Sequence, residues 1–211
     1  MSEEIVLYTN PMSRGRIARW MLEEVGQPYR VEVLGYGTTM KAPEYLALNP
    51  MGKVPAIVHR GAVVTETAAI CAYLADAFPQ AGLLPEAGPA RAAYFRWIFF
   101  AAGPLEAAVV NRTLQVEVAP DKAAFVGYGS FERVMDVLEE ALSHGDYIAG
   151  DRFSAADVYV GSHVGFGLQF GSFEKRPAFE AYHARVASRP AARRANEADD
   201  RLMAEARGGG G

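Results

Sequence analysis

Three short segments in the first third of the chain carry polar side chains beside turn and helix-start patterns. In the first, a β-rich run ends at Tyr8, and the hydroxyl of Ser13 comes just before a helical pattern. Free backbone N–H groups and the positive end of the helix dipole make such a position suitable for an anion. The alternative interpretation is that Ser13 only caps the helix, a role for which serine is strongly preferred.

Two neighbouring side chains compete with Ser13 as the hydrogen-bond donor of this segment. Tyr8 falls within the β-rich run, and Asn10 precedes Pro11, where asparagine commonly builds a turn. The sequence therefore ranks Ser13 first and leaves Tyr8 and Asn10 as alternatives.

The second and third segments offer groups that could hold a charged ligand. Residues 49–55 read NPMGKVP and open a strand pattern at Pro55, with Lys53 as a cation beside it. Residues 64–70 begin a helix at Thr65 or Glu66 and place Thr67 in its first turn, where N–H groups can bind a carboxylate. The alternatives are a solvated Lys53 and a Glu66 that merely places favourable charge at a helix start.

A cluster of basic residues lies near the start of the first helix. It consists of Arg14, Arg16 and Arg19. These side chains either contact a ligand or the following linker, or they form a solvated face.

The elements that must position these segments form a strand–helix–strand unit followed by two strands and a helix. We expect strands over residues 5–8, 29–33, 54–58 and 62–64 and helices over 17–25 and 65–77. This order predicts a thioredoxin-like βαβ-ββα domain, so the fold class is α/β followed by all-α.

A loop rich in proline and glycine divides the chain. Three prolines and two glycines fall within residues 78–89, which is typical of a linker. We therefore predict a thioredoxin-like domain over 1–78, a linker over 79–88 and an all-helical domain over 89–211. Its expected helices cover 89–118, 121–144, 154–167, 177–187 and 190–207. Ser154 and Asp157 form a capping box at one of these helix starts.

Composition excludes several classes of function. The net charge is −4 and there is one cysteine, Cys71. The negative net charge argues against a nucleic-acid binder that relies on positive charge. The single cysteine excludes a disulfide framework, a zinc site with several thiolates and a Cys-x-x-Cys reductase. No metal-ligand spacing appears, no apolar run reaches the length of about 20 residues that a membrane span needs, and the acidic start Met1-Ser2-Glu3-Glu4 is unlike a secretory signal. We expect a cytoplasmic protein without a metal.

The order and spacing of these motifs resemble the soluble glutathione transferase family, in its bacterial serine-type form, over nearly the whole chain. The resemblance implies that Ser13 donates a hydrogen bond to the thiolate of glutathione, with Tyr8 and Asn10 as rivals. It implies a cis Val54-Pro55 bond, with Val54 facing the cysteinyl unit of glutathione. Lys53, and less strongly Lys41, would approach the glycine carboxylate, while Glu66 and Thr67 would hold the γ-glutamyl group.

The resemblance also implies a second substrate and a partner. A hydrophobic electrophile would contact Met12, Phe99, Phe100 and Gly103, with Phe166, Gln169 and Phe170 as weaker candidates, although core packing is the alternative for each aromatic residue. Conjugation is the expected reaction, peroxide reduction needs the same thiolate, and a homodimer is expected. The competing hypothesis is a non-catalytic interaction module of the same fold.

Overall fold

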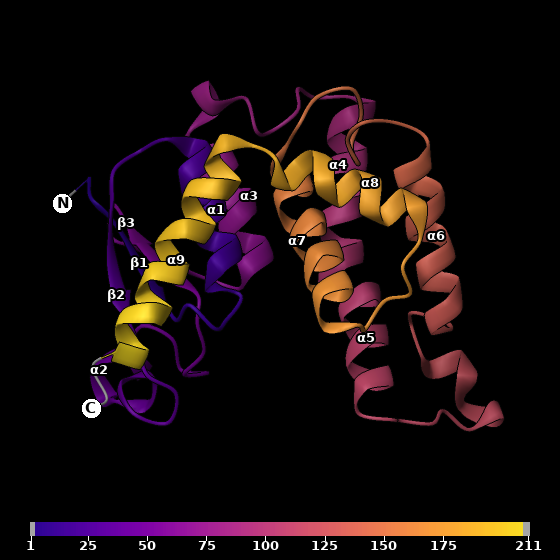
Figure 1. The fold of residues 1–211 in the computed structure, drawn as a ribbon, viewed down its shortest axis with the longest axis horizontal. Coiled ribbons are helices and arrows are strands. Elements are labelled where there is room, and N and C mark those ends of the chain that lie inside the picture. Colours follow the sequence, from indigo (N-terminus) through magenta and orange to yellow (C-terminus); the bar gives the residue numbers. More distant parts are fainter. Residues whose placement is uncertain (1–2, 209–211) are drawn as a thin grey trace. The chain divides into compact units, whose positions relative to one another are not determined.

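The computed structural model describes residues 3–208, so part of the acidic start lies outside it. This part of the chain forms two compact units (Figure 1). One runs to Leu83 and includes the chain from Ser188 onward, and the other spans Leu84–Ala187. This division differs from the predicted one, which assigned all of 89–211 to the helical domain.

The first unit contains a four-stranded mixed sheet in the order β2-β1-β3-β4. Its strands are β1 (Ile5–Thr9), β2 (Tyr29–Val33), β3 (Ala56–His59) and β4 (Ala62–Thr65). β1 pairs with β2 in parallel and with β3 antiparallel. The hairpin between β3 and β4 turns at Arg60 and Gly61, whose φ angles of 51° and 82° are both positive. Two-residue hairpin turns favour this conformation because it matches the twist of the strands.

Helices α1 (Gly15–Val25) and α3 (Thr67–Ala77) lie side by side and pack against the sheet. The residues predicted to form the apolar stripe of α1, which are Ile17, Trp20, Met21 and Val25, are all buried. α1 ends at Gly26, whose φ of 72° lets its N–H bond back to the carbonyl of Leu22. The short helix α2 (Pro43–Leu46) carries Tyr45, which packs on Tyr8 and Ala56 in a separate small core.

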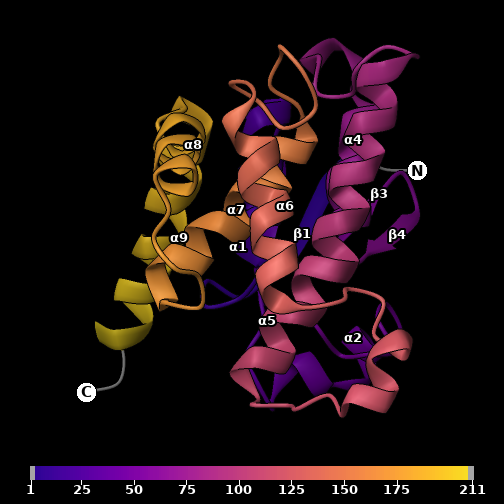
Figure 2. The same ribbon diagram turned by 90° about the vertical axis from the view of Figure 1, so that its right-hand side faces the viewer.

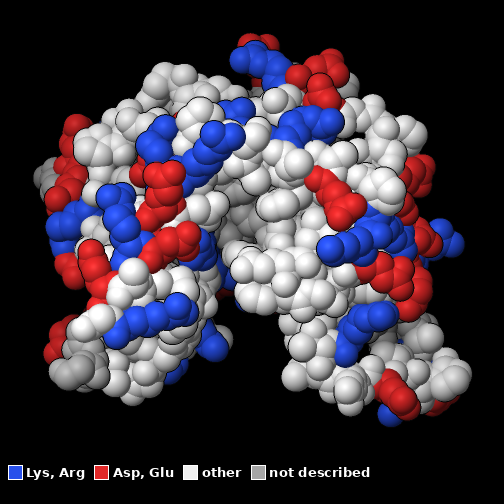
Figure 3. Space-filling model, viewed as in Figure 1, with Lys and Arg blue, Asp and Glu red and all other residues white. Residues whose placement is uncertain are grey.

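The last helix, α9 (Pro190–Gly208), belongs to the first unit because it packs along α1. Three ion pairs join the two helices: Arg16 with Asp200, Arg19 with Asp199, and Arg194 with Glu23. A fourth joins Arg189, directly before α9, to Glu24 of α1. Acidic and basic side chains are accordingly interspersed over this surface (Figure 3). Two members of the predicted arginine cluster, Arg16 and Arg19, are therefore held by α9 rather than forming a solvated face.

The second unit is helical, as predicted, and Figure 2 shows its helices packed side by side. Its helices are α4 (Pro89–Phe100), α5 (Glu106–Thr113), α6 (Phe131–Ser143), α7 (Ala155–Phe170) and α8 (Pro177–Ala187). A π-helical turn, Ala101–Leu105, joins α4 to α5 and contains Pro104. The expected capping box is present at the start of α7, between Ser154 and Asp157.

Two predicted helices are shorter than the sequence indicated. The first ends at Thr113 instead of 118, and the second begins at Phe131 instead of 121. A 3₁₀ segment, Pro120–Phe125, precedes it, and Gly129 with a φ of 74° ends any continuous helix there. Ser130 then starts α6 by accepting the N–H of Arg133 at 3.1 Å.

Among residues 3–208, the stretch Pro89–Thr113 is the one helical segment that is both long and apolar enough to span a membrane. An 18-residue window within it has a mean hydropathy of 1.2, which meets the criterion for crossing a membrane by length and composition alone. Core helices of soluble proteins meet the same criterion. The absence of a membrane span therefore remains a prediction.

The single cysteine is chemically shielded. Cys71 in α3 is fully buried, and burial raises the pKa of its thiol to about 12. Because the thiolate is the reactive form, we expect a disulfide reagent at neutral pH to leave the native protein unmodified and to label one thiol after unfolding. Fast labelling of the native protein would contradict this structure of α3.

Candidate functional site

The strand register brings the three predicted segments to one end of the sheet. Tyr8, near the end of β1, pairs with Ala56 at the start of β3, so the 9–13 turn lies beside the Val54-Pro55 peptide. Ala56 in turn pairs with Thr65 at the end of β4, after which Glu66 and Thr67 start α3. Residues separated by about sixty positions in the sequence thus meet at one edge.

Ser13 lies in the turn that leads into α1 and is partly buried. Its Oγ accepts the N–H of Gly15 at 2.9 Å and donates to the carbonyl of Asn10 at 2.6 Å. The backbone N–H of Ser13 donates to that same carbonyl at 3.0 Å. Ser13 therefore lies one residue before Arg14, the N-cap of α1, and its hydroxyl bonds the first backbone N–H of that helix. The Ser13 hydroxyl hydrogen can turn away from the Asn10 carbonyl without leaving that carbonyl unbonded, because the Ser13 N–H still donates to it.

The amide of Asn10 is occupied in building the turn. Its Nδ2 donates to the carbonyl of Leu34 at 2.8 Å, and its Oδ1 accepts the N–H of Met12 at 2.9 Å. The side chain is also nearly buried. These bonds agree with the turn-building role that the sequence favoured for Asn10.

Tyr8 lies on the opposite face of β1 from the α1 side, since side chains alternate along a strand. Its ring lies 5.6 Å from that of Tyr45, and both Tyr8 and Val54 pack on the same small core. No hydrogen bond of the Tyr8 hydroxyl is found within residues 3–208. Tyr8 therefore stays close to the predicted site and remains the structural rival of Ser13.

Beneath the turn, sequence reasoning missed a close approach between Thr9 and Gly15. Thr9 is fully buried, and its Oγ1 has no hydrogen-bond partner among the described residues. A Cβ on Gly15 would lie 1.9 Å from this oxygen and 3.0 Å from the Oγ of Ser13. Only glycine fits at position 15, a requirement that becomes visible once β1 and α1 are packed.

The unpartnered hydroxyl of Thr9 gives a testable stability effect. Thr9→Val keeps the shape and removes the buried polar atom, whose desolvation costs about 1–3 kcal/mol when unsatisfied. We expect a free energy of unfolding higher by about 1 kcal/mol in urea titrations. Thr9→Ser is the control, because it keeps the hydroxyl and loses the methyl group. A destabilised Thr9→Val protein would show that the hydroxyl has a partner.

The 49–55 loop is held from two sides. The Lys53 carbonyl accepts the Tyr45 hydroxyl at 2.5 Å and the Asn49 Nδ2 at 2.8 Å. Lys41, which the sequence ranked as a weaker ligand candidate, donates its Nζ to the Gly52 carbonyl at 2.8 Å. The Val54-Pro55 bond is cis, as the resemblance implied. Lys53 itself is exposed and forms no ion pair with the described residues.

Glu66 has a backbone conformation that is rare for glutamate. Its φ is 65° and its ψ is 118°, and it immediately precedes α3. Residues held in such regions cluster at functional sites. The first backbone hydrogen bond of α3 runs from the Ile70 N–H to the Glu66 carbonyl at 2.9 Å. The N–H groups of Thr67 and the next two residues therefore have no acceptor within the helix. Thr67 is buried, whereas the Glu66 side chain is exposed.

The residues predicted to contact an electrophile are largely on the surface. Met12 in the first unit and Phe99 in the second are 68% and 67% exposed, which rules out core packing for Phe99. Phe100 is partly buried with its ring 5.2 Å from that of Trp97, and Gly103 is exposed in the π-helical turn. Phe166 and Phe170 lie together on α7, with ring centroids 6.1 Å apart, near Gln169.

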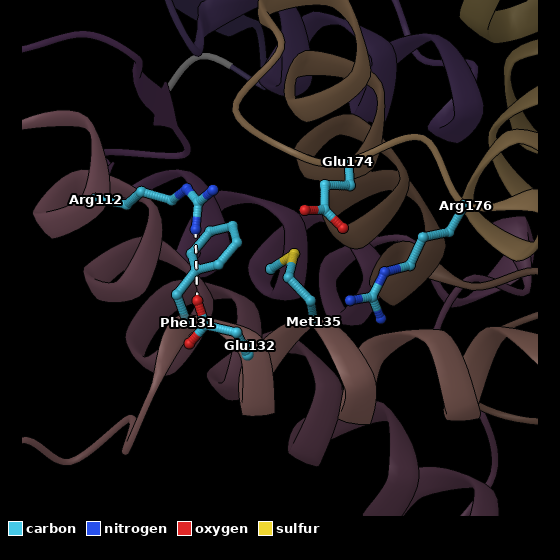
Figure 4. Close-up of a pocket in the computed structure, with 6 residues that line it drawn as sticks. All are labelled: Arg112, Phe131, Glu132, Met135, Glu174 and Arg176. Atoms are coloured by element: carbon cyan, nitrogen blue, oxygen red, sulfur yellow. Dashed lines mark ion pairs between the residues drawn. The ribbon is translucent and has the colours of Figure 1, made fainter.

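A small surface pocket in the helical unit was not predicted (Figure 4). It is lined by Arg112, Phe131, Glu132, Met135, Glu174 and Arg176. Arg112 pairs with Glu132 at 3.6 Å, and Arg176 pairs with Glu139 at 2.7 Å. Because acidic neighbours already compensate both guanidinium groups, this pocket does not present a free cation to a ligand. Within residues 3–208, no group of three or more His, Cys, Asp or Glu side chains is placed to hold a metal ion.

The fold and this edge of the sheet define a thioredoxin-like domain joined to a helical domain. Comparison with known families gives two matches: "Glutathione S-transferase, N-terminal domain" over residues 12–77 and "Glutathione S-transferase, C-terminal domain" over 119–190. Glutathione S-transferase 3 of Zea mays is 31% identical over 88% of this chain and 90% of its own. The chain belongs to the glutathione S-transferase family, which confirms the predicted family, fold and enzyme class.

Two further relatives bear on function. The structure of a sphingomonad glutathione S-transferase complexed with glutathione is 28% identical, with a TM-score of 0.76 over 92% of this chain and 98% of that one. The disulfide-bond oxidoreductase YfcG of Escherichia coli is 29% identical over 89% of this chain and 92% of its own. The family therefore includes relatives named for two kinds of reaction.

Proposed function

We propose that this protein binds glutathione at the sheet edge formed by the 9–13 turn, the Val54-Pro55 peptide and the start of α3, and transfers its thiolate to a hydrophobic electrophile. The observation that carries the proposal is the register that brings these three segments together in a chain of this family. Glutathione is a co-substrate in this reaction.

Each part of glutathione has a matching group. Val54 offers its backbone N–H and carbonyl to the cysteinyl unit, as an added strand would. The first N–H groups of α3 and the hydroxyl of Thr67 bind the γ-glutamyl carboxylate, and Glu66 holds the ammonium. Lys53, which has no ion-pair partner among the described residues, approaches the glycine carboxylate.

Ser13 activates the thiol in this proposal. Its hydroxyl turns from the Asn10 carbonyl to the sulfur, while the Ser13 N–H keeps that carbonyl bonded. A hydrogen bond to a charged group contributes about 1.5–3 kcal/mol, and 1.36 kcal/mol corresponds to one pKa unit. The thiol pKa should thus fall by about one to two units from about 8.5.

The conjugation step conserves atoms and charge. The sulfur of the thiolate forms a bond to an electrophilic carbon, and a leaving group such as chloride departs with its electron pair. The exposed side chain of Met12, which lies in the same turn as Ser13, is suited to contact the apolar part of such a substrate. A homodimer and a cytoplasmic location belong to the same proposal and rest on family membership.

Glutathione titrations followed by the ultraviolet absorbance of the thiolate would test this function. We expect the wild-type protein to lower the thiol pKa and Ser13→Ala to raise it again by about one to two units, with a matching loss of rate toward chlorodinitrobenzene. Tyr8→Phe is the matched control, while Asn10→Ala tests the other rival and also removes the two bonds by which Asn10 builds the turn. Reversal by Tyr8→Phe alone would move the donor to Tyr8, and no binding at millimolar glutathione would favour the interaction module instead.

Reduction of disulfides is the second candidate, which the similarity to YfcG favours. Because Cys71 is buried, glutathione itself would have to supply both thiols: two glutathione molecules reduce one disulfide and become glutathione disulfide. Formation of glutathione disulfide from a small disulfide substrate, at a rate above that of conjugation, would identify this reaction. Peroxide reduction is tested in the same assay with an alkyl hydroperoxide.

A further inference from the structure

Arg16 connects the turn that carries Ser13 to the last helix of the chain. One guanidinium nitrogen of Arg16 lies 3.4 Å from the Pro11 carbonyl, and the other donates to Asp200 at 2.7 Å and lies 3.3 Å from the Asn196 Oδ1. The same side chain is only 20% exposed. A planar fork of this kind fixes several partners at once, which a lysine cannot do.

The contact with Pro11 bears directly on Ser13. Pro11 follows Asn10, whose carbonyl accepts both the hydroxyl and the backbone N–H of Ser13. A change in the position of the Pro11 carbonyl would therefore also move the acceptor that orients the Ser13 hydroxyl. Small displacements of an activating group are costly, because about 1 Å can lower a rate by about a hundredfold.

We propose that Arg16 is a positioning residue for the Ser13 turn, and that Asp200 and Asn196 of α9 hold it in place. The inference rests on the proposed function, since it assigns a support to the same site. The Asp200 carboxylate at 2.7 Å compensates much of the guanidinium charge. The effect of Arg16 is thus one of geometry, through its contact with the Pro11 carbonyl.

The same two helices provide a matched control. Arg194 of α9 donates to the Glu23 carboxylate at 2.8 Å and reaches the Glu23 carbonyl at 3.2 Å. This pair joins α1 to α9 near the other end of α1 and, within residues 3–208, makes no hydrogen bond or ion pair with the 10–13 turn. Arg194→Met therefore removes one arginine between the same helices without touching the turn.

The experiment compares Arg16→Met, Arg16→Lys and Arg194→Met with the wild-type protein. We expect Arg16→Met to raise the pKa of bound glutathione toward its ordinary value of about 8.5 and to lower kcat by about tenfold at saturating glutathione. Arg16→Lys should raise the pKa of bound glutathione equally, because lysine keeps the positive charge but lacks the planar guanidinium that contacts several partners at once. Arg194→Met should keep the wild-type thiol pKa.

Two results for the pKa of bound glutathione would overturn the proposal. A wild-type pKa in Arg16→Lys would show that charge is sufficient. A pKa raised equally in Arg194→Met would show that any loosening of α9 has the same effect.

Hydrogen exchange of residues 10–15 without glutathione gives a separate readout. We expect faster exchange in Arg16→Met and Arg16→Lys but not in Arg194→Met, and unchanged exchange in the two Arg16 variants would also overturn the proposal. A wild-type protein that binds no glutathione would instead contradict the proposed function, while exchange would still decide whether Arg16 positions the turn.

Discussion

Replacing Arg19 with methionine is expected to lower the free energy of unfolding by about 3–5 kcal/mol, the cost of leaving a buried charge without its partner. Arg19 of α1 and Asp199 of α9 are 4% and 0% exposed, and their atoms meet at 2.9 Å. Removing the guanidinium leaves the buried carboxylate without the hydrogen bond from Arg19. Urea unfolding at neutral pH measures the loss.

The pH dependence of this variant provides a second check. Burial raises the pKa of Asp199, and the nearby Arg19 and Arg16 oppose that shift. A carboxyl with a raised folded-state pKa binds its proton more tightly in the folded protein, so ionisation destabilises the fold as pH rises through that pKa. Without Arg19, only Arg16 of these two arginines still opposes the rise in the pKa of Asp199. We therefore expect the stability of Arg19→Met to approach that of the wild type as the pH is lowered.

A double variant distinguishes the cost of an unpaired buried charge from the cost of altered packing. One nitrogen of Arg19 and one oxygen of Asp199 are buried without hydrogen-bond partners among the described residues, so the pair is only half satisfied. Replacing a buried pair with apolar residues is often neutral or stabilising. Arg19→Met combined with Asp199→Leu should thus recover most of the loss. Equal instability in the double and the single variant would show that packing, and not charge, is responsible.

The buried pair of Arg19 and Asp199 also shows which part of the fold could not be predicted from the sequence. Local patterns were sufficient for the sheet and its helices, because apolar periodicity and turn residues act over a few positions, as in the stripe Ile17, Met21 and Val25. The return of α9 to α1 depends on contacts between residues about 180 positions apart, such as Arg19 and Asp199. No local pattern distinguishes an arginine that meets such a partner from one in solvent.

At the candidate site too, some features could be predicted from sequence patterns and others depend on packing. The spacing of Ser13, Val54-Pro55 and Glu66 was enough to predict which segments meet at one edge of the sheet, because the family pattern ties those residue types to the strand register. The present bonds of the Ser13 hydroxyl and the approach of Thr9 to Gly15 arise only from packing. These contacts decide how the Ser13 hydroxyl is oriented, which residue types alone do not specify.

Replacing Asp157 with alanine is expected to cost about 3–5 kcal/mol in the free energy of unfolding. Asp157 is fully buried and accepts four hydrogen bonds: from the N–H of Ile148 at 2.8 Å, the N–H and Oγ of Ser154 at 2.9 and 3.1 Å, and the hydroxyl of Tyr182 at 2.9 Å. It thus ties the loop before α7 to α8. Alanine leaves several buried donors unsatisfied, each at about 1–3 kcal/mol.

Two variants separate this network from ordinary helix capping. Ser130→Ala removes the cap of α6, whose side chain accepts one hydrogen bond, and should cost about 1 kcal/mol. Tyr182→Phe removes one donor to Asp157 and should also cost about 1 kcal/mol. If Asp157→Ala costs no more than Ser130→Ala, the carboxylate acts only as a cap. A clearly larger loss, only partly reproduced by Tyr182→Phe, would show that Asp157 holds the loop, α7 and α8 together.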